Sequence, residues 1–284
     1  MTLRAMTYNL KNASDDDFPP WEGRRPLIAE LIERHRPHIF GTQEGHYRQI
    51  RAVAGDPSPA YEWIGIGRHG GSRSEFNAIV FDPCVAEPIE WDNFWLSETP
   101  DAVGSKTPAW DHDVVRMATW ARFAVTLDGV RRELVWLNTH LDHRSEIARR
   151  RGAALIVERL SEVDGPVVIS GDFNTGPDSP VLQVFADAGY ADTFTVSRTP
   201  PPQTGTCLDG TDSFADTDSA SAGRRSTSCW SGAASRWCRS PWMRGRSMGG
   251  GHRITRRCLP SSTFPAGRPA RPVPRSRGNP HRPR

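Results

Sequence analysis

An acid and an amide stand two residues apart at the end of an apolar run. Residues 170–174 read SGDFN and directly follow the apolar run 166–169. A run of this kind is typical of a buried strand, so Asp172 and Asn174 are expected at its end, on one face. A carboxylate can accept a proton from water, and an amide can hold an oxygen of an anion. Each residue alone is typical of a turn, so the pair needs partners elsewhere before it indicates a site.

A second segment supplies such partners. Residues 138–143 read NTHLDH after another apolar run, and strand alternation puts Asn138, His140 and Asp142 on one face. Three further polar residues stand at the ends or starts of predicted strands: Asn9, Glu44 and Glu75. Taken together, these positions indicate a site rather than a series of unrelated turns.

The elements that must position these residues follow from hydrophobic periodicity and turn signals. Strands are predicted at 3–10, 37–44, 62–67, 76–82, 118–127, 133–141 and 166–173, and helices at 26–35, 145–163 and 179–189. Ser145 is the predicted N-cap of the longest helix. Several hairpins with few long helices predict an α/β fold, a four-layer sandwich of two mostly antiparallel sheets flanked by helices.

The charge is divided unevenly along the chain. The 284 residues contain 36 Lys and Arg and 33 Asp and Glu. Because 15 of the Arg and none of the acids lie in 221–284, residues 1–220 carry 21 basic against 33 acidic residues, a net charge of −12. An acidic body argues against broad electrostatic wrapping of nucleic acid, and it is compatible with carboxylates gathered around a metal.

Other sequence features limit the class of protein. We expect no membrane span, because an apolar run of about 18 residues is missing. The first residues lack the pattern of a secretory signal, so a cytoplasmic location is expected. The five Cys include no C-x-x-C pair, which disfavours a zinc cage.

The motifs MTYNL, TQE, SEFNAIVF, NTHLDH and SGDFN, in this order and spacing, resemble the endonuclease/exonuclease/phosphatase superfamily. The segments FWLSETP (94–100) and ATWARF (118–123) look like an uncharacterised branch of metal-dependent hydrolases within it. The resemblance covers residues 3–206. It implies the deoxyribonuclease I-like fold and a Mg²⁺- or Mn²⁺-dependent phosphoesterase or phosphodiesterase, in which metal-assisted water attacks a phosphate ester.

The resemblance also assigns roles to residues. Glu44 would be the principal metal ligand, with Asn9 beside it. Asp172 would orient or deprotonate the attacking water, and Asn174 would hold a phosphate oxygen or the nucleophile. His140 would donate to the phosphate or the leaving group.

Glu75 resembles the acid that pairs with this His in the nuclease branch. Asn138, Asp142 and Arg116 are further candidates for contact with the substrate, although Asn138 is expected mainly to support its loop.

The C-terminal part departs from the family pattern. The superfamily has an Asp-containing strand and an Asp-His motif near its C-terminus, and neither is encoded here. Codons compatible with 224–233 and with 251–263, read one base earlier, permit both motifs in the right order. We therefore hypothesise a frame-shift between about codons 206 and 226, which the nucleotide sequence would test.

This hypothesis divides the chain into two parts. Residues 1–206 form an incomplete domain of the family, and 207–284 form a disordered Arg/Pro/Ser/Gly-rich tail that replaces the last strands. Because the motifs that would close the site are absent, low activity and poor solubility are expected.

Two alternatives to the phosphoesterase stay open. One is a nuclease of the same fold, acting on DNA or RNA. The other is a catalytically dead remnant whose Arg-rich tail binds anions. The expected substrate is a phosphate ester of a small molecule or a lipid headgroup, with nucleic acid as a weaker candidate, and the chain is expected to be a monomer.

Overall fold

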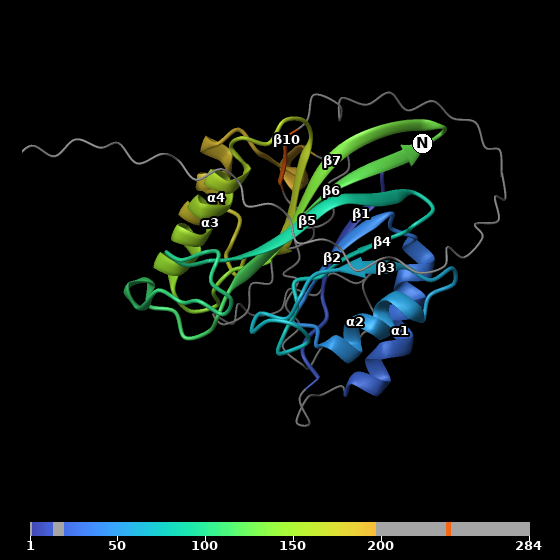
Figure 1. Ribbon diagram of the computed structural model, residues 1–284, viewed down its shortest axis with the longest axis horizontal. Helices are drawn as coiled ribbons and strands as arrows, with labels where there is room; N and C mark the ends of the chain where they lie inside the picture. Colours follow the sequence, from blue (N-terminus) through green and yellow to red (C-terminus); the bar gives the residue numbers. More distant parts are fainter. Residues whose placement is uncertain (1, 14–19, 197–236, 240–284) are drawn as a thin grey trace, which may run out of the picture. The chain divides into compact units, whose positions relative to one another are not determined.

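Two β-sheets form the framework of the part that the structure describes. The computed structural model describes residues 2–13, 20–196 and 237–239 (Figure 1). The first sheet has the order β1(Ala5–Asn9), β2(Ile39–Gln43), β4(Ile79–Phe81) and β3(Glu62–Ile64). The second sheet has the order β5(Ala86–Trp95), β6(Met117–Leu127), β7(Val130–His140), β8(Val167–Asp172), β10(Trp237–Arg239) and β9(Ala191–Asp192).

Helices cover the outer face of each sheet (Figure 1). The described helices are α1(Trp21–His35), α2(Tyr47–Gly55), α3(Glu146–Leu160), α4(Pro180–Asp187), α5(Thr193–Val196) and the 3-10 turn η1(Pro108–Trp110). Apolar residues of α1 and α2 pack on the first sheet, and those of α3 and α4 pack on the second. A third core lies between the sheets and contains Phe81, Phe123 and Trp136. These layers confirm the predicted four-layer sandwich.

Two parallel strand pairs bring the ends of four strands into the same region. β1 pairs with β2 in parallel, and the last register pair is Asn9 with Gln43. β7 pairs with β8 in parallel, and the last register pair is His140 with Asp172. The other described pairs are antiparallel. Helix α1 connects β1 to β2, and α3 connects β7 to β8, so each pair can run parallel. The carboxyl ends of these four strands are therefore where functional side chains can meet.

Local sequence explains several elements. The Ser145 hydroxyl accepts a hydrogen bond from Ala148 N (3.1 Å) and caps α3, as predicted. The predicted hairpin between β6 and β7 is present, with Asp128 and Gly129 at positive φ in its turn.

The structure also contains elements that the sequence patterns did not predict. α2 and β5 are new, and α1 begins at Trp21, five residues before the predicted start. Most of the predicted tail lies outside the described residues, as does the predicted domain boundary at residue 206. Residues 237–239 are described, and they form β10 rather than the disorder expected there.

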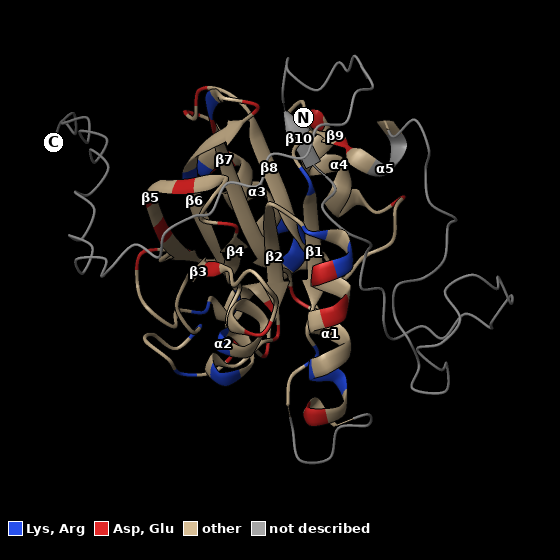
Figure 2. Ribbon diagram, turned by 90° about the vertical axis from the view of Figure 1, so that its right-hand side faces the viewer, with Lys and Arg blue, Asp and Glu red and all other residues tan. Residues whose placement is uncertain are grey.

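Charged residues lie mainly on helices and connecting loops, while the sheets are mostly uncharged (Figure 2). Helix α1 carries both signs of charge along its length (Figure 2). Within the described segments, every helix falls short of the length and apolarity needed to cross a bilayer.

Candidate active site

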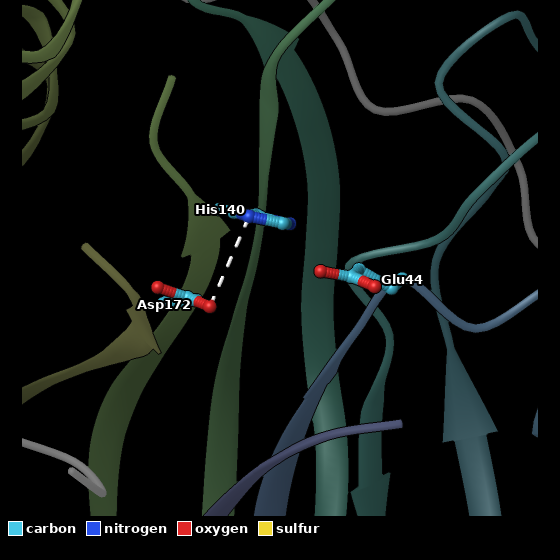
Figure 3. Close-up of side chains that lie close together, drawn as sticks. All are labelled: Glu44, His140 and Asp172. Atoms are coloured by element: carbon cyan, nitrogen blue, oxygen red, sulfur yellow. Dashed lines mark ion pairs between the residues drawn. The ribbon is translucent and has the colours of Figure 1, made fainter. Parts of the chain in front are cut away.

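Two carboxylates and an imidazole converge at the strand ends. Glu44, His140 and Asp172 each offer a ligand atom, and these atoms lie within 4.8 Å of one another (Figure 3). Nε2 of His140 is 3.9 Å from Oδ2 of Asp172. His140 and Asp172 are buried, and Glu44 is partly exposed. The cluster joins residues 44, 140 and 172, which the sequence placed at the ends of three different strands.

The side chain of Asn9 connects the two carboxylates. Its Nδ2 donates to Oε1 of Glu44 (2.8 Å) and to Oδ2 of Asp172 (2.9 Å). Its Oδ1 accepts from the backbone N–H of Lys11 (2.9 Å). Asn9 ends β1, so it joins the first sheet to Asp172 at the end of β8 in the second. The structure therefore brings Asn9 to the cluster, as the resemblance predicted.

Helix α1 holds the segment that follows Asn9. Arg24 is buried and donates to the carbonyls of Leu10, Lys11 and Asn12. The backbone N–H of Asn12 in turn donates to Oε2 of Glu44 (3.3 Å). No sequence signal pointed to Arg24, because its partners are backbone carbonyls that any residue supplies.

Two residues of the site have left-handed backbone conformations. Glu44 has φ of 61° and Asn174 has φ of 48°. For residues other than glycine this region is uncommon, and it costs of order 1 kcal/mol. The turn at Asn174 is stabilised by its N–H, which donates to Oδ1 of Asp172 (3.0 Å). Sites with such backbone strain are frequently functional.

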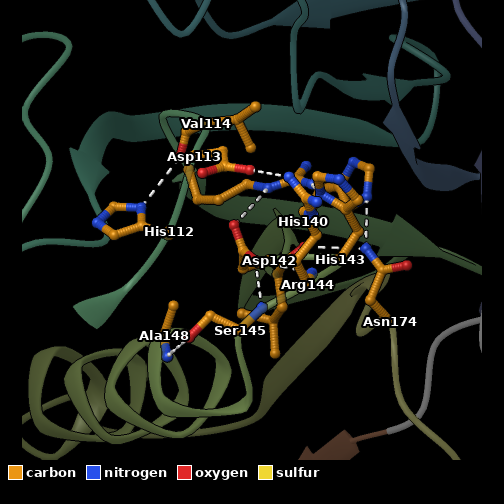
Figure 4. A network of polar contacts seen from close by, with 12 residues as sticks. His112, Asp113, Val114, His140, Asp142, His143, Arg144, Ser145, Ala148 and Asn174 are labelled. Carbon is orange, nitrogen blue, oxygen red and sulfur yellow. Dashed lines mark hydrogen bonds and ion pairs between the residues drawn. The ribbon is translucent and has the colours of Figure 1, made fainter. Parts of the chain in front are cut away.

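The Asn174 amide also sets the tautomer of the His140 imidazole. Its Nδ2 donates to the carbonyl of Leu141 (3.0 Å) and lies 2.9 Å from Nε2 of His140 (Figure 4). Because Nδ2 is a donor, Nε2 of His140 acts as the acceptor, and the imidazole proton resides on Nδ1. Among the described residues, Nδ1 of His140 has no hydrogen-bond partner although it is buried.

Burial shifts the two titrating groups of the cluster in opposite directions. Burial raises the pKa of Asp172, and the Glu44 carboxylate raises it further, while hydrogen bonds from Asn9 and Asn174 oppose this. Burial lowers the pKa of His140 well below its usual value, and the charges of Arg116 and Arg68 act in the same direction. His140 is therefore a neutral imidazole, and Asp172 is a more basic carboxylate than a solvated one.

The donor set fits a hard divalent cation. Two carboxylates from different sheets face each other, and the neutral amide of Asn9 is what lies between them. Carboxylate oxygens are ligands that Mg²⁺ and Mn²⁺ prefer. Glu44 and Asp172 contribute ligand atoms to one cluster, and this closeness supports the fit of the site to a divalent cation.

Arg116 lies beside this cluster as a buried cation. Its side chain is 7% exposed, and its Nη2 is 3.1 Å from Nδ1 of His143. Its Nε has no hydrogen-bond partner in the described part of the chain and is 4.0 Å from Oδ2 of Asp142. Oδ1 of Asp142 accepts from the N–H groups of Arg144 and Ser145, so Asp142 shapes its own loop.

Two other predicted residues occupy positions that the sequence did not anticipate. Glu75 forms a bidentate ion pair with Arg68 (2.9 and 3.1 Å), and none of its hydrogen bonds within the described segments goes to His140. Asn138 is fully buried between the sheets. It donates to the carbonyls of Thr42 and Ala78 and accepts from Gln43. This position does not support the substrate contact expected for Asn138.

Arg68 and His143 are site residues that the sequence reasoning missed. Arg68 lines one pocket together with Glu75, Arg116 and His140. His143 follows Asp142 directly, so its neighbourhood in NTHLDH was the available signal. Arg68 lies between the predicted strands 62–67 and 76–82, where a charged residue is ordinary.

The profile of the Endonuclease/Exonuclease/phosphatase family matches residues 6–254. This match extends past residue 206, where we expected the resemblance to end. A curated relative is the uncharacterized protein L388 of Acanthamoeba polyphaga mimivirus, 29% identical over 164 residues and 55% of this chain. This chain spans only 59% of the length of that relative.

Solved structures show the same fold. An endonuclease/exonuclease/phosphatase from Bacteroides vulgatus is 31% identical with a TM-score of 0.63, over 68% of this chain and 74% of that one. A mannosyl-6-phosphatase from Bacteroides thetaiotaomicron is 32% identical with a TM-score of 0.62, over the same shares. The family profile spans most of the sequence, and the fold agrees with it. The chain belongs to the Endonuclease/Exonuclease/phosphatase family.

Proposed function

We propose that this protein is a divalent-metal-dependent hydrolase of phosphate esters. The observation that carries the proposal is the cluster of Glu44, His140 and Asp172, whose ligand atoms lie within 4.8 Å of one another. Members of the family hydrolyse phosphate esters, which supports this class of reaction. The 32% identity to a mannosyl-6-phosphatase makes a sugar phosphate the first substrate to test.

Glu44 would be the principal ligand of Mg²⁺ or Mn²⁺, with Asn9 beside it, and Asp172 would face the ion from the second sheet. The ion, when bound, supplies positive charge that neutralises the phosphate and its transition state. Asn9 keeps the two carboxylates together, because its amide donates to both. Arg24 acts indirectly, because its hydrogen bonds fix the backbone of Leu10–Asn12 next to Asn9.

The protein groups provide proton transfer and orientation. Asp172 accepts a proton from the attacking water, and its raised pKa favours this. His140 would hold a phosphate oxygen through its unpartnered Nδ1–H. Asn174 would orient this imidazole, because its Nδ2 faces His140 Nε2 and the Leu141 carbonyl. His140 is kept neutral by burial, so it donates one hydrogen bond from Nδ1 without carrying a charge.

The nuclease and the anion-binding remnant have less support. Residues 1–220 have a net charge of −12, which disfavours contact with a polyanionic duplex. A clustered acid pair with a raised pKa is a costly arrangement to keep in a protein without activity. Because the Asp-His motif expected from the resemblance is not encoded, the chain as given is expected to turn over slowly.

A panel of phosphate esters tests the proposal. Sugar phosphates, nucleotides, a phosphodiester and a lipid headgroup phosphate would be incubated with Mg²⁺, Mn²⁺ or EDTA. The chain as given and a chain with the restored reading frame would be compared. Activity should require metal and should fall at least about 100-fold in Glu44→Ala and Asp172→Ala, which lose a ligand and a base.

The matched control is Glu30→Ala, which removes an exposed acid of α1 that pairs with Arg34. It should keep the parental rate. Hydrolysis in EDTA, or full activity of Glu44→Ala and Asp172→Ala, would contradict the assignment of the site.

A further inference from the structure

A group of hydrogen-bonded polar side chains lies between the two sheets, next to the metal-ligand cluster. We call it the polar layer, and its members are Thr7, Gln43, Asn138 and Ser170. Gln43, Asn138 and Ser170 are at most 1% exposed, and Thr7 is partly exposed. A buried polar side chain is costly unless it is hydrogen-bonded, so the bonds within this layer define its geometry.

The polar layer follows the same strands that carry the site. Each member precedes one site residue on its strand, and the pairs are Thr7 with Asn9, Gln43 with Glu44, Asn138 with His140, and Ser170 with Asp172. Thr7, Asn138 and Ser170 each stand two residues before their partner, so both side chains of each pair share one face of the strand. The polar layer is therefore the step before the site along all four strands.

The amide of Gln43 joins the two sheets. Its Nε2 donates to Thr7 Oγ1 (2.9 Å) on β1 and to Asn138 Oδ1 (2.8 Å) on β7. Asn138 Oδ1 also accepts from Ser170 Oγ (3.1 Å) on β8. Asn138 Nδ2 donates back to two main-chain carbonyls on the side of the first sheet, at 2.8 and 2.9 Å. One chain of hydrogen bonds thus connects β1, β2, β7 and β8.

Gly41 allows β2 to come this close to the second sheet. A Cβ at this position would lie 2.3 Å from Asn138 Oδ1 and 2.5 Å from Ser170 Oγ, closer than real Cβ contacts. Gly41 and Gln43 are two residues apart and share a face of β2. The missing side chain at position 41 therefore leaves the space in which the Gln43 amide reaches Asn138.

Ser170 is anchored by the core between the sheets. Its Oγ accepts from Trp136 Nε1 (2.8 Å), and the Trp136 side chain is fully buried in that core. The hydroxyl is thereby oriented toward Asn138 Oδ1, to which it donates.

Hydrogen bonds constrain packed sheets in a way that apolar contacts do not. The hydrophobic effect is non-directional and depends on the area that is buried, so it tolerates small displacements of one sheet along the other. Hydrogen bonds require a narrow range of distances and angles, and buried groups that lose a partner are penalised. The polar layer therefore restricts how the strand ends can move relative to each other.

We propose that the polar layer positions the site, because it holds the strand ends of the first sheet at a fixed distance from those of the second. The contact that it sets is the hydrogen bond from Asn9 to Asp172 (2.9 Å), together with the approach of Glu44 to Asp172. Its members lie outside the cluster of ligand atoms, so they act through their neighbours as positioning residues. The consequence for metal binding rests on the proposed function, whereas the geometry of the strand ends does not.

A double-mutant cycle tests the inference without metal or substrate. The coupling free energy between Asn9 and Asp172 would be measured in the full chain by urea unfolding in EDTA, from Asn9→Ala, Asp172→Ala and the double variant. The cycle would be repeated in Gln43→Met, which keeps a long side chain and removes both hydrogen bonds that Gln43 donates. The coupling should fall at least about twofold in that background, because the sheets lose their directional contact.

The matched control is Thr139→Val. Thr139 directly precedes His140 and is fully buried, and its Oγ1 donates to Met117 O (3.0 Å) within the second sheet. This variant loses a buried hydrogen bond near the site without changing the contact between the sheets, so the coupling should equal that of the parent. Unchanged coupling in Gln43→Met, or an equal fall in Thr139→Val, would overturn the inference.

A second variant decides the question if Gln43→Met does not fold. Ser170→Ala combined with Trp136→Phe removes the acceptor and the donor of one hydrogen bond together, which costs less than leaving one of them unpaired. Asn138 then loses the donor that fixes it from β8, and the coupling between Asn9 and Asp172 should fall here too. A coupling equal to that of the parent would overturn the inference.

Mn²⁺ binding separates this inference from the proposed function. In calorimetry, Gln43→Met should bind Mn²⁺ at least about tenfold more weakly than the parent, since groups that orient metal ligands affect affinity to this degree. Thr139→Val should bind as the parent does. Equal affinity of Gln43→Met and the parent would overturn the positioning role and leave the metal site intact. A parent that does not bind Mn²⁺ would contradict the metal site, and the coupling between Asn9 and Asp172 would still decide the role of the polar layer.

Discussion

The side-chain nitrogen of Asn9 lies 2.9 Å from Oδ2 of Asp172, although 163 residues separate them in sequence. Asn9 ends β1 in the first sheet, and Asp172 ends β8 in the second. The packing of the two sheets at this end therefore sets how closely the carboxylates of Glu44 and Asp172 approach each other.

The first prediction concerns Asn9→Asp. The substitution replaces the shared donor by a third carboxylate beside Glu44 and Asp172, and like charges at this distance repel. In EDTA we expect a loss of about 1–3 kcal/mol in the free energy of unfolding, measured with urea. Added Mn²⁺ should restore more stability to this variant than to the parent. Asn93→Asp, which alters another partly buried amide, is the control and should lose less; an unchanged Asn9→Asp would contradict the prediction.

The second prediction separates stability from metal binding at Glu44. Glu44→Gln removes the charge that raises the pKa of Asp172, so the metal-free protein should gain about 0.5–2 kcal/mol. The same variant should lose the increase in Tm that Mg²⁺ gives the parent, because a ligand that binds only the folded state stabilises it. Thermal unfolding with EDTA and with Mg²⁺ measures both effects. A Tm that still rises with Mg²⁺ would show that Glu44 is not a ligand.

The third prediction concerns the contact between the sheets. Asn138→Leu removes, in a fully buried position, the amide donor to the carbonyls of Thr42 and Ala78 and one acceptor of the Gln43 amide. We expect a loss of about 2–4 kcal/mol, measured by urea unfolding. Asn93→Leu removes an acceptor from one hydroxyl donor, Thr119, and should cost less. Similar losses in both variants would mean that the hydrogen bonds of Asn138 between the sheets contribute no more to stability than the one hydrogen bond of Asn93.

The fourth prediction is a pH dependence of stability at His38. His38 is buried, and its Nδ1 accepts from Arg4 N (3.1 Å), so burial and Arg4 lower its pKa below 6.5. The folded state then binds fewer protons than the unfolded state. Stability is therefore present above about pH 6.5 and is lost as the pH falls toward the folded pKa.

Urea unfolding at pH 7 and pH 5, in EDTA, measures the loss. His38→Asn keeps an acceptor for Arg4 N and removes the titrating group, so its stability should change less between these pH values. His35→Asn at the exposed end of α1 is the control and should follow the parent. If His38→Asn loses as much stability as the parent, His38 is not the group responsible.

The sequence predicted the features that arise within short segments. The turn at SGDFN depends on the hydrogen bond from Asn174 N to Asp172 two residues earlier. The cap of α3 depends on Ser145 and Ala148, three residues apart. Strong periodicity and local caps are visible in one sequence, so these elements were predicted correctly.

Features that depend on distant segments were not predictable in the same way. Strand alternation put Asn138 and His140 on one face, but only the packing of the sheets shows that position 138 is covered and position 140 is at the site. The surroundings of Arg116 depend on the approach of two loops through Asp113 and Arg144. β5 was missed because its acidic, exposed residues and the bulge near Pro88 interrupt the alternation.

Strand β10 has a consequence for the strand that carries Asp172. It pairs with Val167–Ile169 of β8 on one side and with β9 on the other, so β8 has a neighbour along both edges. Strand pairing uses main-chain N–H and C=O groups, which every residue except proline supplies. The second edge of β8, the strand that carries Asp172, is therefore paired through main-chain groups of residues 237–239.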